Sequence, residues 1–434
     1  MTPSPIGWFG IVRLGLVQSA IGAIVMLGTS LLNRVMVVEY ALPAALPAGL
    51  VAWHYAVQLS RPAWGHGSDK GRRRTPWIVA GIALLALGAL LAVQALPFLA
   101  TRAVEGYVLA VLAFSMIGAG VGAAGTSVLA LLAARVAPER RAAAASITWI
   151  MMIAGIVVTA GIAGRLIDPY SLHRLTMVTG GVAVGAFVVA LVAVWGIEGR
   201  GWAVVAETPT AASPTFAASL REIMADPEAR RFTIFVFLSM LAYSMQDLIL
   251  EPFAGLLFGF TPGQSTTLSG VQHGGVLAGM ILVGVSGGAF GKRTPAGMRR
   301  WIVAGCIGSA LALAGLAMAA RAGPGWPLSA NIAALGFANG MFAVAAIGAM
   351  MGLAGADGGG REGIRMGVWG AAQAIAFGLG GLIGAIGVDV GRKVTGSTPE
   401  TFALVFIVEA LLFLVAATLA LRVTGAPSQS LQPA

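Results

Sequence analysis

Long apolar runs alternate with short polar breaks along most of the chain. Prolines, charged residues and glycine-rich segments mark where each apolar run ends. The runs between them predict helices of about 20 apolar residues, the length that crosses a bilayer. The pattern therefore predicts twelve membrane-spanning helices in two sets of six. The first set covers residues 11–33, 47–63, 76–99, 104–134, 142–167 and 175–196, and the second covers residues 231–250, 264–289, 298–320, 328–354, 363–388 and 402–421.

A weak internal repeat relates the two sets. The pentapeptide Trp77–Gly81 recurs as Trp301–Gly305, 224 positions later, and Trp149 matches Trp369, 220 positions later. Two matches at nearly one offset favour a duplicated six-helix unit, as in many transporter folds. The predicted domains are an N-terminal six-helix half at residues 1–197, a cytoplasmic linker at 198–230 and a C-terminal six-helix half at 231–434.

Composition agrees with an all-α membrane protein. The 434 residues include 27 basic and 17 acidic ones, about 10% charged, and 58% are apolar, whereas a soluble domain carries roughly 25% charged residues. The net charge of +10 comes from Lys and Arg in short loops, so no nucleic-acid partner is expected. A single cysteine and four histidines argue against a disulfide framework and against a multi-ligand metal site.

The distribution of Lys and Arg predicts the topology. Alternate loops place 20 of the 27 basic residues on one side of the membrane. Because basic loops stay in the cytoplasm, both termini are expected to be cytoplasmic. The N-terminal residues lack the charged region and cleavage site of a signal peptide, so no cleaved signal is expected.

The loop after the second predicted helix carries a recognisable motif. It reads Gly65-His-Gly-Ser-Asp69-Lys-Gly-Arg72-Arg73-Arg74 and resembles the cytoplasmic loop signature of the major facilitator superfamily, with one residue missing after Lys70. The resemblance implies that superfamily's fold of twelve helices in two pseudo-symmetric halves. The arginines either hold this loop on the cytoplasmic side of the membrane or take part in gating.

Longer stretches resemble a narrower family. They are residues 32–39 with Asn33, Arg34 and Glu39; residues 58–62, 65–69 and 74–77; and residues 246–252 with Gln246, Asp247, Glu251 and Pro252. These stretches are similar to the PucC/LhaA family, the bacteriochlorophyll-delivery branch of the superfamily. The resemblance implies an assembly factor for bacterial light-harvesting complexes, which binds bacteriochlorophyll non-covalently or delivers it to antenna polypeptides.

The family resemblance also implies a location and partners. The expected location is the bacterial inner membrane, in its intracytoplasmic photosynthetic form. The expected partners are antenna polypeptides, with bacteriochlorophyll-synthesis enzymes and the membrane insertion machinery as further ones.

Two intramembrane histidines are candidate pigment contacts. His54, beside Trp53 and Tyr55, and His273, beside Gln272, are separated by 219 positions, close to the repeat offset. They are therefore expected at near-equivalent places in the two halves. A neutral imidazole can be the axial ligand of a chlorophyll magnesium or contact the pigment's carbonyls. The alternative is that each histidine only hydrogen-bonds neighbouring helices.

Intramembrane acids are costly and mark a function or a partner. Asp247 and Glu251 lie one turn apart near the end of the seventh predicted helix, where Pro252 frees a backbone carbonyl. These acids either couple transport to proton binding, or one of them forms an ion pair with Arg34 that joins the two halves. Glu409 is expected near lipid headgroups or a partner protein.

No catalytic motif is present, including an aspartate-rich pair for magnesium diphosphate. The chain is therefore not expected to be an enzyme, and the alternative function is secondary transport of a small or lipophilic solute. Few polar residues are expected at the midplane, mainly Gln18, Gln246, Asp247 and Asn339. This scarcity favours a lipophilic ligand or a protein partner.

Overall fold

The computed structural model describes residues 6–61, 64, 73–137, 140–198, 221, 224–225, 227–286, 295–355 and 362–422. These residues form helices and short connections, with no strand among them. The N-terminal helices are α1 (Trp8–Met26), η1 (Leu27–Leu31), α2 (Leu32–Arg34), η2 (Val35–Glu39), α3 (Ala45–Gln58), α5 (Thr75–Ala100), α6 (Val104–Arg135), α7 (Arg141–Leu166) and α8 (Leu172–Val194). The C-terminal helices are α10 (Pro227–Asp247), α11 (Leu250–Phe258), α12 (Pro262–Ser286), α13 (Pro295–Ala322), η4 (Gly323–Gly325), α14 (Leu328–Gly355), α15 (Glu362–Thr395) and α16 (Thr398–Arg422).

Each of the twelve predicted spans has a helical counterpart. Within the described residues, 11 continuous helical stretches are long and apolar enough to cross a membrane. The remaining span corresponds to α3, whose described length is 14 residues. The first span is longer than predicted, because α1, η1, α2 and η2 form one continuous stretch from Trp8 to Glu39. The prediction of a multi-pass helical membrane protein is confirmed.

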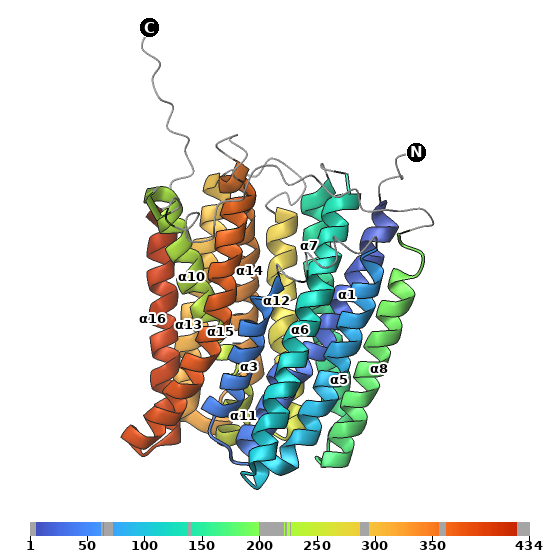
Figure 1. The fold of residues 1–434 in the computed structure, drawn as a ribbon. Coiled ribbons are helices and arrows are strands. Elements are labelled where there is room, and N and C mark those ends of the chain that lie inside the picture. Colours follow the sequence, from blue (N-terminus) through green and yellow to red (C-terminus); the bar gives the residue numbers. More distant parts are fainter. Residues whose placement is uncertain are drawn as a thin grey trace.

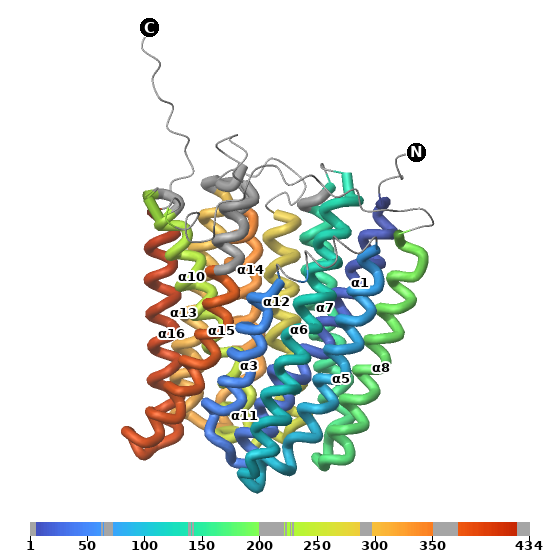
Figure 2. Tube along the Cα trace, in the orientation of Figure 1, coloured from blue at the N-terminus to red at the C-terminus, as the bar shows by residue number. Residues whose placement is uncertain are grey.

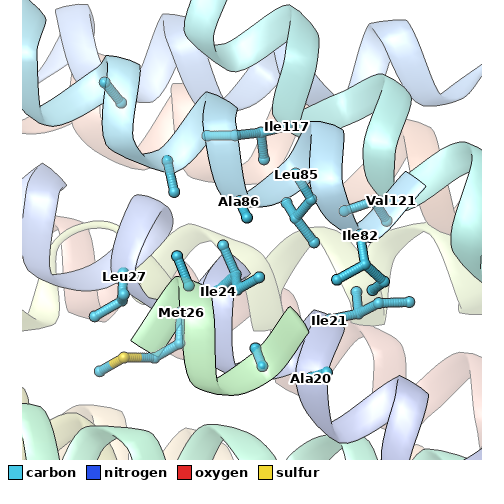
Figure 3. Packing of buried hydrophobic residues seen from close by; sticks show 14 of the residues in the cluster. Ala20, Ile21, Ile24, Met26, Leu27, Ile82, Leu85, Ala86, Ile117 and Val121 are labelled. Carbon is cyan, nitrogen blue, oxygen red and sulfur yellow. The ribbon is translucent and has the colours of Figure 1, made fainter. Parts of the chain in front are cut away.

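The helices pack around two hydrophobic cores. One core is built almost entirely from residues 6–197, and the other from residues 232–420. In the first core, Ile21 of α1 faces Ile82 and Leu85 of α5 and Val121 of α6 (Figure 3). Small residues allow α5 and α6 to approach closely, since a Cβ at Gly81 would lie 2.6 Å from the backbone nitrogen of Ala124. The exact domain limits stay a prediction, because most of the linker lies outside the described residues.

The two halves stand side by side and meet along two seams (Figures 1 and 2). In one seam α3 packs against α15, and in the other α7 packs against α12. Helix α1 begins and α16 ends at the same end of the bundle (Figure 1), which we name the terminal end. The other is the opposite end. This arrangement of the first and last helices agrees with an even number of crossings.

The seventh span is broken between α10 and α11, at Leu248 and Ile249. Pro252 has no backbone N–H, so it leaves the carbonyl of Leu248 without its helical partner. Asn33 of α2 fills that vacancy from the other half: its Nδ2 donates to Leu248 O over 2.7 Å. The structure thus brings together two stretches that carried the family resemblance, and it gives the freed carbonyl a specific partner.

Part of the loop motif cannot be placed. Gly65, Asp69 and Arg72 lie outside the described residues. Arg73 is exposed just before α5. The start of α5 is capped by Glu198, whose carboxylate accepts hydrogen bonds from the backbone nitrogens of residues 74 and 75 over 2.8 and 3.0 Å. An acid at this position complements the positive end of the helix dipole.

Candidate functional site

A cavity of about 460 Å³ lies between the two halves. Its walls come from α1, α3, α6 and α7 of the N-terminal half and from α10, α11, α12, α14 and α15 of the C-terminal half. Apolar side chains such as Ile21, Val25, Met152 and Ile156 form much of the surface. A central, mostly apolar cavity with a few polar groups is typical of a small-molecule binding site.

Among the described residues, the exposed part of the cavity lining lies toward the terminal end. Lining residues near that end, such as Arg61 and Leu129, are exposed. Lining residues toward the opposite end, such as Ser30, Glu251 and Ser269, are buried. The structure therefore has the shape of a transporter-like bundle that is closed at one end.

His54 lines the cavity, but both of its ring nitrogens are engaged within α3. Gln58 Nε2 can only donate, so His54 Nε2 accepts from it over 2.8 Å, and His54 Nδ1 donates to Val51 O over 3.1 Å. Arg61 donates in turn to Gln58 Oε1. His54 is thus the middle of a hydrogen-bond chain along one helix, and its lone pair is already used.

His273 lines the same cavity from α12, so the two histidines face one space. Its Nδ1 donates to Ser269 O over 2.9 Å, which places the lone pair on Nε2. No residue in the described part of the chain hydrogen-bonds that Nε2. A histidine fixed through Nδ1 with a free Nε2 is the usual arrangement of a metal-ligating imidazole.

The neighbours of the histidines separate into lining and non-lining residues. Tyr55 lines the cavity and stacks on Phe377 of α15 with ring centroids 6.0 Å apart. Gln272 also lines it. Trp53 does not: it is 47% exposed on the outer face of α3 and donates to Ser115 Oγ of α6 over 2.7 Å. Trp53 was therefore wrongly predicted as a pigment contact, because residues one apart on a helix point in different directions.

The acids of the seventh span reach the cavity. Asp247 lines it and accepts from Gln272 Nε2 at 3.5 Å, a long contact. Glu251 also lines it, and its Oε1 accepts from Ser30 of η1. Gln246 of the same motif is fully buried and points into the C-terminal core instead. The motif thus divides between the cavity wall and the interior of one half.

Arg34 is 2% exposed and joins the two halves near the opposite end. Its Nη1 pairs with Glu39 of the same span, and its Nη2 donates to Phe260 O of the other half over 2.7 Å. Glu251 is not its ion-pair partner in the described structure. The joining role predicted for Arg34 therefore rests on a backbone carbonyl, while its acid partner lies on its own side.

The polar content of the cavity exceeds the prediction. Gln18 and Asp247 line the cavity, whereas Asn339 and Gln246 do not. Additional polar groups come from α3 and the residues just after it, from α12 and from α15, which were not counted among the central helices. They include His54, Gln58, Arg61, Gln272, His273 and Gln373. Hydropathy alone identified these segments as apolar and could not show that their few polar residues share one face.

Two aspartates clamp the seams at the opposite end. Asp389 of α15 accepts from the backbone nitrogens of Ala44 and Ala45 at the start of α3, over 3.0 and 2.7 Å. Asp168, after α7, accepts from Gly263 N at the start of α12 over 3.1 Å and from the Thr261 hydroxyl. Residues 168 and 389 are 221 positions apart, so the two caps obey the internal repeat.

Replacing both cap aspartates is expected to loosen the closed end. Each Asp→Ala change removes an N-terminal cap worth about 0.5–2 kcal/mol, and each cap crosses a seam between halves. In Asp168→Ala/Asp389→Ala, spin labels on exposed Val104 and Val394 should report a broader and longer distance distribution. The control is Glu400→Ala, which breaks the exposed pair with Arg321 inside one half. Identical distributions in all three proteins would contradict the clamp.

Solved structures share the fold at low sequence identity. A POT-family peptide transporter in complex with sulfate is 16% identical, with a TM-score of 0.67 and 98% of each chain covered. The nucleoside transporter NupG is 12% identical, with a TM-score of 0.67, covering 95% of this chain and 99% of that one. The predicted fold of the major facilitator superfamily is confirmed.

Curated relatives cover nearly the whole chain. The "Bacteriochlorophyll synthase 44.5 kDa chain" of Rhodobacter capsulatus is 53% identical, covering 97% of this chain and 96% of that protein. Its name contradicts the prediction that the present chain is not an enzyme, and that prediction is corrected here. The absence of short motifs was insufficient, because a site can be assembled from residues distant in sequence, as this cavity is.

Two proteins named PucC are more distant. The one from Rhodobacter capsulatus is 31% identical, over 94% of this chain and 90% of that protein. The one from Cereibacter sphaeroides is 29% identical, over 90% and 84%. A family model described as "PUCC protein" matches residues 31–427, which include most of both halves and every cavity-lining residue from Val51 onward. The chain therefore belongs to the PUCC protein family.

Proposed function

We propose that the chain binds bacteriochlorophyll in its central cavity and passes it to antenna polypeptides, working beside or within the assembly that makes the pigment. The observation that carries this proposal is the free Nε2 of His273 in a cavity between the halves. The 53% identical relative, named as a chain of bacteriochlorophyll synthase, supports the choice of pigment.

The residues present fit such a ligand. Bound bacteriochlorophyll supplies a magnesium ion with an open axial position and carbonyl groups that accept hydrogen bonds. The His273 imidazole has the lone pair for the axial position. Arg61 and Gln373 line the same cavity and can donate to carbonyls, while Tyr55, Phe377 and Tyr243 form an aromatic wall. His54 assists by holding Gln58 and Arg61 in place.

The proposed setting is the intracytoplasmic photosynthetic membrane, with the terminal end in the cytoplasm. Basic residues support this orientation: Arg73, Arg140, Arg230, Arg299 and Arg300 all precede or begin helices at the terminal end. The cavity then opens to the cytoplasmic side, where pigment synthesis enzymes and newly inserted antenna polypeptides are proposed to meet the chain.

Replacing His273 with phenylalanine is expected to remove most of the pigment that copurifies with the chain. Losing a metal ligand should cost about tenfold or more in affinity. The comparison variant is His54→Phe, which removes no free lone pair but disturbs Gln58 and Arg61, so it is expected to lose less pigment than His273→Phe. Both variants are expressed in a pigment-making phototroph and purified in mild detergent. Pigment per protein is read from the absorption spectrum, and copurifying polypeptides are identified by mass spectrometry.

Equal pigment in wild type and His273→Phe would overturn the ligand role of His273. A colourless wild-type protein without antenna polypeptides would overturn the proposed function itself. Size-exclusion profiles establish that each variant is folded before its spectrum is compared.

A second candidate function is transport of a small zwitterionic solute. Arg61 offers a cation near the open end and Asp247 offers an acid deeper in the same cavity, a pairing that suits a solute with a carboxylate and an amine. A colourless wild-type protein that such solutes stabilise against heat would favour this function over pigment binding.

A further inference from the structure

A second polar site lies inside the C-terminal half, away from the cavity. Glu409 of α16, Gln246 of α10 and Asn339 of α14 are each 0% exposed. Glu409 was predicted near lipid headgroups or a partner protein, which is wrong, because it lies on the face of α16 that packs into the core. Hydropathy placed it in the correct helix but could not show which way that helix faces.

Two aromatic layers fix the position of these residues. The first layer is Phe253 with Phe402 and Phe406, with centroids 5.2 and 5.0 Å from that of Phe253. Since Phe253 ends its span and Phe402 begins α16, the two segments run antiparallel. The second layer, nearer the terminal end, is Phe342 with Tyr243 and Phe413, at 6.2 and 5.5 Å.

The three polar residues share the level between these layers. Gln246 follows Tyr243 by three residues, Asn339 precedes Phe342 by three, and Glu409 precedes Phe413 by four. Residues three or four apart lie on one face of a helix. Each polar side chain is therefore one turn from the second aromatic layer, on the side toward the opposite end. We name these three residues the buried polar layer.

The buried polar layer is unsatisfied. Among the described residues, no hydrogen-bond partner exists for either oxygen of Glu409, for Oε1 and Nε2 of Gln246, or for Nδ2 of Asn339. Only Asn339 Oδ1 is paired, accepting from Ser309 Oγ of α13 over 2.7 Å. Buried polar atoms without partners cost on the order of 1–3 kcal/mol each, and a bare carboxylate costs far more. Five such atoms at one level indicate bound water and a neutral acid.

The chemistry of the layer suits a protonated carboxyl. A neutral Glu409 needs one acceptor for its O–H and donors for its carbonyl oxygen. Gln246 Oε1 is an acceptor without a partner among the described residues, and Gln246 Nε2 and Asn339 Nδ2 are donors without one. The carboxyl also lies within electrostatic range of Asp247 on the cavity wall. Gln246 of the buried polar layer and Asp247 of the cavity wall are therefore consecutive residues of α10.

The surrounding charges do not compete with this role. Asp247 is the acid whose charge reaches Glu409, and Glu251 of α11 lines the cavity. Tyr243 and Cys306 are the other buried titratable groups of this core. The remaining described charged residues on α10, α13, α15 and α16 lie toward helix ends: Arg230, Arg231, Arg299, Arg300, Arg321, Asp389, Arg392, Lys393, Glu400 and Arg422.

We propose that Glu409 is a proton-binding site, which holds one proton in the buried polar layer and exchanges it with Asp247. In the exchange the Glu409 O–H bond breaks and an Asp247 O–H bond forms, so one negative charge moves from the cavity wall into the core and the total charge is unchanged. Occupancy of the cavity next to Asp247 is thereby linked to protonation. This site is independent of the nature of the cavity ligand.

Infrared spectroscopy tests the proposal in purified full-length protein in lipid vesicles. With ¹³C-labelled glutamate, the wild type at neutral pH is expected to show an isotope-sensitive carbonyl band of a protonated carboxyl. Absence of any such band overturns the proposal without requiring a variant. Glu409→Gln should remove the band. The matched control is Glu400→Gln, on the same helix but in an exposed ion pair, which should keep it.

A third variant separates proton binding from a structural role. Gln246→Leu removes the proposed partner, so the Glu409 band is expected to persist and move to the frequency of a less hydrogen-bonded carbonyl. An unmoved band would overturn the role of the buried polar layer. Loss of the wild-type band on adding sodium or potassium chloride would also overturn the proposal, since the oxygens would then hold a metal cation.

Discussion

Arg34→Leu is expected to lower the free energy of unfolding by about 1–3 kcal/mol, because an acceptor shielded from water that loses its donor costs about that much. Glu39 is 31% exposed, so water can solvate its carboxylate once the arginine is removed. Here the loss leaves Glu39 without its cation and Phe260 O without its donor from the other half. Thermal unfolding and the monodisperse fraction in detergent measure the effect.

The matched control for this change is Arg321→Leu. It is the same substitution in another arginine–glutamate pair, but the Arg321 and Glu400 side chains are 62% and 50% exposed. An exposed pair contributes about 0–1 kcal/mol, so this variant should unfold close to the wild type. Arg34→Lys is expected to fall between the two, because an ammonium keeps the charge but not the two-pronged geometry. Similar melting of all variants would contradict a joining role for Arg34.

Gly336→Ala is expected to push α12 and α14 apart. A Cβ at Gly336 would lie 2.0 Å from the backbone oxygen of Gln272, so a rigid helix backbone would have to move. Overpacking of this kind typically costs about 1–3 kcal/mol. Because Gln272 and His273 belong to the cavity wall, the same shift should reduce any ligand retained by the cavity. Thermal unfolding and ligand content measure the two effects separately.

The control lies two residues from Gln272, on a different face of the same helix. Gly274→Ala, in the same helix α12, would place its Cβ with no atom within 4 Å. Alanine has a higher helix propensity than glycine by about 1 kcal/mol, so this variant should be unchanged or slightly more stable. If both glycine variants behaved alike, close backbone packing between α12 and α14 would not be what holds this part of the bundle.

Two glycine-rich runs, at residues 118–125 and 378–384, pack helices closely in the same way. A Cβ at Gly120 would meet the Gly81 oxygen at 2.6 Å, and one at Gly380 would meet Ser244 Oγ at 2.0 Å. Gly125 has no atom within 4 Å and lines the cavity. Most glycines of the two runs therefore pack helices, although a flat ring could use the same small residues. Spacing alone cannot distinguish the two uses, because both need the same missing side chain.

Several residues show where prediction from sequence stopped. The repeat offset predicted near-equivalent places for His54 and His273 in the two halves, and in the structure both residues line the central cavity. It could not predict that Gln58 occupies the lone pair of His54 while that of His273 stays free. Trp53 and Glu409 were misplaced for one reason: hydropathy locates a helix, whereas the face that each residue presents depends on which helices pack around it.

The sequence by itself determined that the chain spans a membrane, the number of spans, the duplication and the family. These features depend on the length of apolar runs, on repeated segments and on short motifs, which can be read from the chain without knowing which residues touch. Only the tertiary structure decided which polar residues meet. Asn33 finds the carbonyl freed by Pro252, the two aspartates cap helices of the other half, and Gln246, Asn339 and Glu409 share one buried level of the C-terminal core. In an apolar interior every polar atom needs a partner, and those partners lie far apart in the chain.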